Sequence, residues 1–144
     1  MKGEISLYVQ AKHYGFAVHS GRSVYFQAGD FCRLTPGGPP PILGEEVEVE
    51  GLGTRSGGNL PQARRVSRTV CPSLLLGRVQ SFDPDKGWGF ANLAESEQIL
   101  FFHASDLLEP WVPSVGAQIK FYSGHKPGRN RARACWVRPL RRRL

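Results

Sequence analysis

Two short stretches decide the fold of this chain: Lys86-Gly87-Trp88-Gly89-Phe90 and, eleven residues after Phe90, Phe101-Phe102-His103. Side chains two apart on a β-strand point to the same face of the sheet. Trp88 and Phe90 are therefore expected on one face, and Phe101 and His103 repeat the arrangement. Glycine between two large rings is costly in a strand and needs a reason, such as the close approach of a ligand. The pattern predicts a hairpin that gathers four rings on one open surface.

An open surface of rings beside a cation is typical of proteins that bind unpaired nucleic acid bases. Each stacked base contributes roughly 1–3 kcal/mol, and cations hold the phosphates. The alternative, that the rings form an ordinary hydrophobic core, is disfavoured by the glycines between them. The sequence therefore predicts a stacking role for Trp88, Phe90, Phe101 and His103, with Lys86 as a phosphate ligand. His103 is also a candidate to hydrogen-bond a base edge or a sugar.

The same residues carry a resemblance to a known family. Gly77–Ala91, which ends in Lys-Gly-Trp-Gly-Phe-Ala, resembles the opening of a cold-shock domain, and Phe101–Ser105 resembles the second signature of that family, Phe-Val-His-Phe-Ser. The resemblance covers roughly residues 76–140. It implies a five-stranded OB-fold barrel that binds single-stranded RNA or DNA without a metal or cofactor. It also implies a role as an RNA chaperone or a regulator of transcription or translation, with a preference for pyrimidine-rich strands.

The first half of the chain repeats the second. Gly3–Ala17 aligns with Gly77–Ala91 at a constant offset of 74, and Val24–Ala28 aligns with Leu100–Ala104 at an offset of 76. Ordered matches along a whole half indicate an internal duplication. Two later matches follow in the same order: Leu43-Gly44 with Val115-Gly116, and Gln62–Val66 with Arg133–Val137.

The duplication predicts an all-β chain of two five-stranded OB-fold barrels in tandem. Short apolar alternations separated by glycine or proline turns support this fold class. The expected organisation is a divergent cold-shock-like barrel over 1–68, a linker over 69–75, a clear cold-shock barrel over 76–140 and a basic tail over 141–144.

Both copies depart from the family pattern by lacking rings. The tryptophan expected in the first strand is Ser81 in the second copy and Leu7 in the first, and the phenylalanine expected after the histidine is Ala104 or Ala28. The loss of two rings could weaken a single barrel by a hundredfold or more. Trp111, in the loop after the third strand, is either a partial replacement for a lost ring or a cap on the barrel end.

The first copy keeps fewer of these residues. In it His13 replaces the glycine of the signature, and Gln27 replaces the histidine. Two interpretations stay open: tandem binding, in which linkage recovers part of the affinity, or a first barrel that packs against or recruits a protein. A protein-interaction adaptor on the transcription or ribosomal machinery is therefore the alternative function. The weaker first-copy candidates for nucleic acid binding are Lys12, Tyr14, Phe16 and Tyr25.

Charge separates the halves. Residues 1–70 hold eight Lys or Arg against six Asp or Glu, a net of +2, whereas residues 71–144 hold eleven against six, a net of +5. A basic stripe near a stacking surface should make binding fall with salt. Lys126 and Arg129 are predicted to hold phosphate, whereas the alternating carboxylates of Glu45–Glu50 favour a protein-binding first half. The basic excess comprises Lys126, Arg129, Arg131, Arg133, Arg138 and Arg141–Arg143.

Other chemistry finds little support in the sequence. Cys32, Cys71 and Cys135 are far apart and form no Cys-x-x-Cys pair, so neither a disulfide framework nor a metal site is expected. Asp83 and Asp85 lack a nucleophile or further metal ligands, so an enzyme is not expected. The chain shows neither a signal-peptide pattern nor a membrane-spanning run, and we expect a soluble cytoplasmic protein. The oligomeric state is left open.

Overall fold

The computed structural model describes residues 1–54, 61–108, 111–129 and 131–140, and the predicted tail 141–144 lies outside them. Within these ranges every element is a β-strand except three single-turn 3-10 helices. None of the described helices has the length or apolar character to cross a bilayer. The three are η1 (Gln10–Lys12), η2 (Ala28–Asp30) and η3 (Ala104–Asp106).

The chain divides into two compact units. The first unit comprises Met1–Pro72 and His125–Arg129, and the second comprises Ser73–Gly124 and the chain from Asn130 onward. The predicted bounds of the two barrels and of the linker 69–75 stay a prediction. Each unit is described by itself below.

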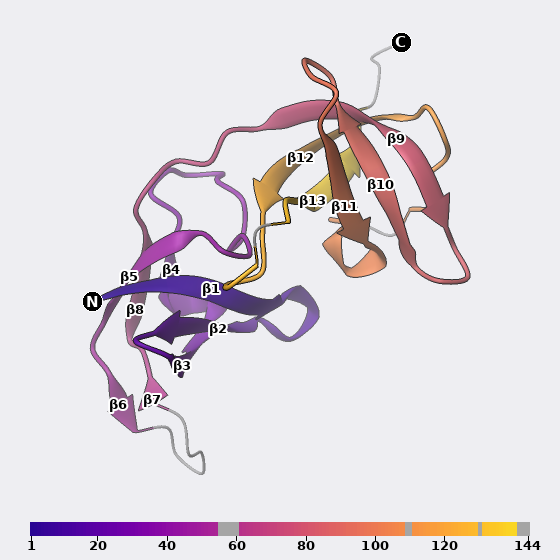
Figure 1. Ribbon diagram of the computed structural model, residues 1–144. Coiled ribbons are helices and arrows are strands. Elements are labelled where there is room, and N and C mark those ends of the chain that lie inside the picture. The colour runs from indigo at the N-terminus through magenta and orange to yellow at the C-terminus, as the bar shows by residue number, and fades with distance from the viewer. Residues whose placement is uncertain (55–60, 109–110, 130, 141–144) are drawn as a thin grey trace. The chain divides into compact units, whose positions relative to one another are not determined.

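Five strands build the second unit: β9 (Leu75–Asp83), β10 (Trp88–Leu93), β11 (Ile99–His103), β12 (Gln118–Gly124) and β13 (Arg133–Pro139). They close into a barrel in the order β10-β11-β13-β12-β9 (Figure 1). The closing rung is parallel and joins Phe101 on β11 to Arg133 on β13. A closed barrel of five strands fits an OB-fold, as the sequence predicts for this half.

The interior of this barrel is filled by alternate residues of its strands, as the period of two dictates. On β10, Gly89 and Ala91 are buried, whereas Trp88 is 36% exposed and Phe90 is half-buried. On β11, the buried residues Leu100 and Phe102 alternate in the same way with outward residues. The structure thus places the rings of Trp88, Phe90 and Phe101 on the outer face of the barrel, whereas the ring of Phe102 points into the core. The core comprises Val79, Ala91, Leu100, Phe102, Ile119, Phe121, Ala134 and Val137.

Gly89 has a different reason from the one expected from sequence. A Cβ atom at this position would lie 2.1 Å from the carbonyl oxygen of Ser81 and 2.8 Å from Cα of Phe82. Strands β9 and β10 approach closely here, beside a register shift between Phe90 and Ala91. The reason for this glycine is therefore the close approach of the neighbouring strand of the same barrel.

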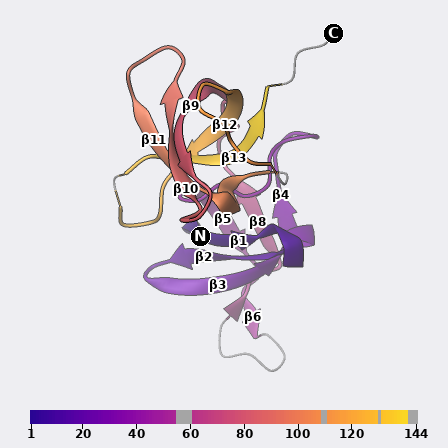
Figure 2. The ribbon, with the colours of Figure 1, turned by 90° about the vertical axis from the view of Figure 1, so that its right-hand side faces the viewer.

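Eight strands build the first unit, in the order β4-β8-β5-β1-β2-β3-β7-β6. The β2–β3 hairpin is seen along its length in Figure 2. Their bounds are β1 (Lys2–Val9), β2 (Tyr14–His19), β3 (Arg22–Gln27), β4 (Phe31–Cys32), β5 (Glu46–Glu50), β6 (Gly53–Thr54), β7 (Pro61–Gln62) and β8 (Arg65–Arg68).

The first unit differs from the closed barrel at one point. Its last stretch is broken into β7 and β8 by Ala63 and Arg64, and each piece pairs with a different neighbour. The Ala63 amide donates to the Tyr25 carbonyl at 2.8 Å, whereas the Arg64 amide donates to the Glu50 carbonyl at 3.1 Å. If β7 and β8 were one continuous strand, it would pair with both β3 and β5, and the sheet would close into a barrel. The result is one closed barrel and one eight-stranded sheet.

The two units nevertheless share a backbone plan. The parallel rung of Tyr25 with Gln62 occupies the place of the closing rung Phe101–Arg133 under the alignment predicted from sequence. The register shift beside Ser6 on β1 likewise falls at the position of Gln80 on β9. Gly44 and Gly116, which align, both have the positive φ that favours glycine, at 79° and 86°. These backbone features lie at corresponding positions of the two units, and a tandem of two barrels stays a prediction.

A buried charge organises the first unit. Arg68 is 1% exposed and forms an ion pair with Glu45, with its Nε 2.6 Å from Oε1. Its guanidinium also donates to the carbonyls of Pro39 and Pro40, at 3.0 and 2.9 Å. Because these carbonyls and the carboxylate satisfy its donors, Arg68 ties the proline-rich loop to β8.

Candidate nucleic-acid interface

The signature strands build a cluster of three rings, Trp88, Phe90 and Phe101, which we name the platform. Cross-strand pairing places Trp88 opposite His103 and Phe90 opposite Phe101. Side chains on one face of such a pair are in contact distance. The Trp88 centroid lies 5.7 Å from that of Phe90 and 6.1 Å from that of Phe101, and the two phenylalanine centroids are 6.1 Å apart. The sequence prediction that these rings gather on one patch is thus met by the geometry.

The platform is bordered by cations. Lys86 Nζ lies 5.9 Å from the Trp88 ring centroid. The guanidinium carbon of Arg131 lies 5.4 Å from the Phe90 centroid and 5.2 Å from the Phe101 centroid. That of Arg133 lies 5.4 Å from the Phe101 centroid. Cations at these distances are attracted by the ring faces, and they give the platform positive charge.

Arg133 is held in place by a buried carboxylate. Its Nε donates to Asp106 Oδ2 at 2.8 Å, and the side chains of the two residues are only 13% and 7% exposed. The same Asp106 oxygen accepts the His103 backbone amide at 2.8 Å, which caps η3. Burial raises the pKa of the Asp106 carboxyl, and the hydrogen bond from His103 and the charge of Arg133 oppose that rise. Asp106 therefore links the end of β11 to the start of β13.

His103 presents a defined hydrogen-bonding group. Its Nδ1 accepts the Ser105 backbone amide at 3.1 Å and lies 3.0 Å from the Ser105 hydroxyl. A ring nitrogen that accepts an amide proton carries no proton itself, so the neutral ring carries its proton on Nε2. His103 is half-buried and stands across from Trp88. Its predicted role, a hydrogen bond to a base edge or a sugar, stays a prediction.

The other second-copy candidates are not among the described residues whose contacts define the platform. Trp111 is half-buried and packs against the barrel core. Lys126 and Arg129 are exposed and belong to the segment grouped with the first unit. Within the described residues, the cations over the platform rings are Lys86, Arg131 and Arg133. A phosphate-binding role for Lys126 and Arg129 stays a prediction.

The first unit holds a similar cluster of three rings. The centroids of Tyr14, Phe16 and Tyr25 lie 5.8, 5.8 and 5.7 Å apart in the three pairings. Tyr25 is only 8% exposed, so less ring surface is open than on the platform. The position of Arg133 is taken by Gln62, and Lys12 is exposed at the end of η1.

Sequence reasoning assigned no site role to Arg131 and Arg133, although it counted both in the basic stripe. A signal was available, because two arginines two apart near the start of a strand face one side of it. What the spacing did not reveal is the parallel rung between Phe101 and Arg133, which brings the last strand beside the rings.

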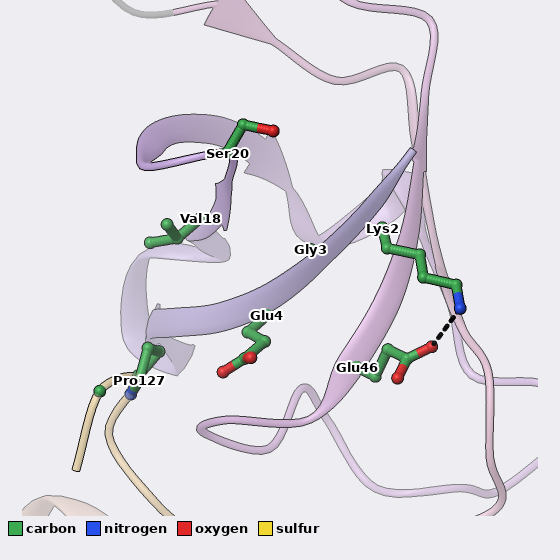
Figure 3. A pocket seen from close by; sticks show the side chains of 8 residues that line it. Lys2, Gly3, Glu4, Val18, Ser20, Glu46 and Pro127 are labelled. Atoms are coloured by element: carbon green, nitrogen blue, oxygen red, sulfur yellow. Dashed lines mark ion pairs between the residues drawn. The ribbon is translucent and has the colours of Figure 1, made fainter.

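A hollow in the first unit has a different character. It is lined by residues of β1, β2 and β5 together with Pro127 and Gly128 (Figure 3). Lys2 Nζ lies 3.8 Å from Glu46 Oε1 across it, and Glu4 adds a second carboxylate. Its walls combine both signs of charge and hold no ring, so it offers no stacking surface.

No family model and no curated protein matches this chain. Among solved structures the chain is similar to one described as "drosophila Unr CSD456", with 18% sequence identity and a TM-score of 0.45. The match covers 97% of this chain and 60% of that chain, so this chain spans less than two thirds of the Drosophila structure. By its own geometry, this is an all-β protein in which a closed five-stranded barrel carries an outward cluster of rings beside three cations.

Proposed function

We propose that this protein binds single-stranded nucleic acid, RNA or DNA, on the platform of its second unit. The observation that supports the proposal is the mutual contact of three outward rings with cations beside them. A hydrophobic core needs no cations, whereas a polyanion with exposed bases requires both rings and positive charge.

The ring planes suggest how a strand lies. Trp88 and Phe101 differ in plane by only 35°, with centroids 6.1 Å apart, so each can take one base of a short run. Phe90 is nearly perpendicular to Trp88, at 88°, and presents its edge to that ring. An edge-to-face contact supports the neighbouring ring more than it offers a stacking face. Trp88 and Phe101 are therefore the proposed stacking residues of first rank, with Phe90 as their support.

Phosphates are held by the exposed cations Lys86 and Arg131, with Lys126 and Arg129 as further candidates. Arg133 contributes less to phosphate binding because Asp106 already neutralises it. Each phosphate neutralised on a single strand makes the logarithm of the affinity fall by about 0.7 per decade of salt. Binding should thus weaken steeply with ionic strength.

The resemblance to cold-shock domains extends the proposal to biological role. It favours a non-enzymatic RNA chaperone or a regulator of transcription or translation that prefers pyrimidine-rich strands. It also favours reading the first unit as an opened version of the same barrel, duplicated in tandem. Stacking discriminates weakly between bases, so any sequence preference is expected to be modest.

A protein-interaction adaptor is the second candidate, favoured by the first unit. Its ring cluster has Gln62 where the platform has Arg133, and Tyr25 is nearly buried. Its strand β5 alternates carboxylates, which repel a phosphate backbone. Under this reading the second unit alone binds nucleic acid, or neither unit does.

Fluorescence anisotropy of labelled oligo-U and oligo-dT, each of about eight nucleotides, tests the proposal. At low salt we expect the wild-type chain to bind and Trp88→Ala to lose about 1–3 kcal/mol, roughly a 5- to 150-fold weaker affinity. Tyr14→Ala, at the matching position of the first unit, should cost less. Leu76→Ala, which truncates a side chain 49% exposed on β9, serves as the control for surface truncation.

The outcomes separate the two candidates. Binding that Trp88→Ala leaves unchanged, in a variant with wild-type circular dichroism, would refute the platform. Failure of the wild-type chain to bind either strand at low salt would leave the adaptor as the better reading.

A further inference from the structure

We infer that Arg131 is a specificity-determining residue. In the free protein its guanidinium covers the platform. When a strand binds, one of its bases displaces this guanidinium from the rings, and a phosphate of the same strand then pairs with the displaced guanidinium. This inference rests on the proposed function and adds to it a rule for which ligands are admitted. The first evidence is position. The Arg131 guanidinium carbon lies 5.4 Å from the Phe90 centroid and 5.2 Å from the Phe101 centroid, so it straddles the two rings.

A stacked base and this guanidinium compete for the same space. Stacked carbon atoms lie about 3.5–4 Å apart, and a base extends sideways over most of a phenyl ring. A group that stands 5.2 Å from the Phe101 centroid and also over Phe90 therefore overlaps a base centred on Phe101. Arg133 also stands 5.4 Å from the Phe101 centroid and keeps its place there, so the space that a base can gain is the one beside Phe90 and Phe101 that Arg131 occupies.

Arg131 is the arginine that can move. Its side chain is exposed, and the residue precedes β13. Arg133, by contrast, is tied to Asp106 at 2.8 Å and is 13% exposed, so its guanidinium is fixed beside Phe101. One arginine of the pair is thus a fixed neighbour of the ring and the other a removable cover.

The fate of the displaced guanidinium gives the selectivity. An exposed contact of a cation with a ring face is weak, equivalent to about two- to fivefold in affinity, so a base can displace the Arg131 guanidinium at a small cost. A phosphate beside the incoming base then accepts the fork of N–H groups, which suits it geometrically. An uncharged aromatic ligand offers no such acceptor. Arg131 should therefore favour strands, which bring base and phosphate together, over free aromatic compounds.

The duplication provides an internal comparison. Gln62 stands at the position of Arg133, and the position of Arg131 is occupied in sequence by Leu60, which lies outside the described residues. Within the described part of the first unit, the arginine over a ring is Arg68 over Phe31, which is not a member of the cluster of Tyr14, Phe16 and Tyr25. In sequence, therefore, neither position of the arginine pair carries an arginine in the first copy.

The test compares two ligands of equal base sequence: an oligo-dT of about eight nucleotides and the same oligomer with an uncharged methylphosphonate backbone. Both are titrated into the full chain, as wild type, Arg131→Ala and Arg22→Ala, with affinity measured at several salt concentrations. Arg22 is exposed at the start of β3 and controls for the loss of one positive charge. Because Arg131 is exposed, its truncation should preserve the fold, and circular dichroism verifies this.

We expect Arg131→Ala to change the two affinities in opposite directions. The phosphodiester strand should bind roughly three- to thirtyfold more weakly, from the loss of a charged hydrogen bond offset by the uncovered rings, and its salt slope should fall by about 0.7. The uncharged oligomer should bind about two- to fivefold more tightly. Arg22→Ala should leave the uncharged oligomer unaffected.

Two results would overturn the inference. Weaker binding of both ligands by Arg131→Ala would mean that the guanidinium stacks on the base from above. Unchanged binding of the uncharged oligomer would mean that the guanidinium does not obstruct the rings. In either case wild-type binding of the phosphodiester strand would leave the proposed function intact, whereas its absence at low salt would refute that function itself.

Discussion

Asp106→Ala is expected to unfold the second unit. Asp106 Oδ2 accepts both Arg133 Nε and the His103 amide at 2.8 Å, and the two charged side chains are 7% and 13% exposed. Removal of one partner of a buried pair costs about 3–5 kcal/mol, because the other charge is left unpaired. A barrel of this size rarely has more than about 3–5 kcal/mol of stability. The loss therefore consumes most of the stability of the unit.

The chain offers a selective assay for this prediction. All three tryptophans, Trp88, Trp111 and Trp136, lie in the second unit, so urea unfolding followed by tryptophan fluorescence reports on that unit. Asp106→Asn keeps an oxygen that accepts from the same two donors. Because this acceptor is neutral rather than charged, the unfolding free energy should fall by only about 1–2 kcal/mol. An Asp106→Ala midpoint that corresponds to less than about 1 kcal/mol of destabilisation would show that the pair does not hold β11 to β13.

Three further predictions follow. Because burial raises the pKa of Asp106, the folded state binds the carboxyl proton more tightly than the unfolded state does. The unfolding free energy of wild type, minus that of Asp106→Asn, should therefore fall as the pH rises from about 4 and level off above the folded pKa. Urea titrations at each pH measure this difference. Arg68→Ala leaves the Glu45 carboxylate without its ion-pair partner and two proline carbonyls without their donor, so the unfolding free energy of the first unit should fall by about 3–5 kcal/mol. Amide exchange in β5 and β8 measures this loss, and protection within about 1 kcal/mol of wild type would contradict it. His13, at φ 57°, occupies the left-handed turn position that Gly87 occupies at φ 76° in the second unit. His13→Gly should stabilise the first unit by about 0.5–1 kcal/mol, because the relief of backbone strain exceeds the entropic cost of glycine. Faster amide exchange in β1 and β2 would argue against this.

Local spacing was sufficient to predict the platform. The period of two places Trp88 with Phe90 on one face, and the second signature places Phe101 across from them, as the cross-strand pairs show. The aligned segments at offsets of 74 and 76 residues predicted a duplication, which stays a prediction. Residues close in sequence thus indicated the rings and the hairpin.

Contacts between distant segments could not be read in this way. The arginines reach the platform through a parallel rung that joins β11 to a strand about thirty residues later. The reason for Gly89 could not be read from sequence, because the carbonyl that crowds it belongs to the preceding strand at a register shift. The break between β7 and β8 depends on where two amides, of Ala63 and Arg64, find their acceptors. The sequence identifies these arginines, carbonyls and amides but does not show which of them contact one another.

The break in the first unit has a consequence for its local dynamics. β8 pairs with β5 through all four of its residues and with β4 through two, whereas β7 has two residues, joined to β3 at Gln62 and Tyr25 and to the two-residue strand β6. A two-residue strand with few rungs opens at lower free energy than a four-residue strand paired along its length. The β6–β7 end of the sheet can therefore detach and reseal while the core around β8 stays shut, which gives a protease or a partner chain access to that end before the unit as a whole unfolds.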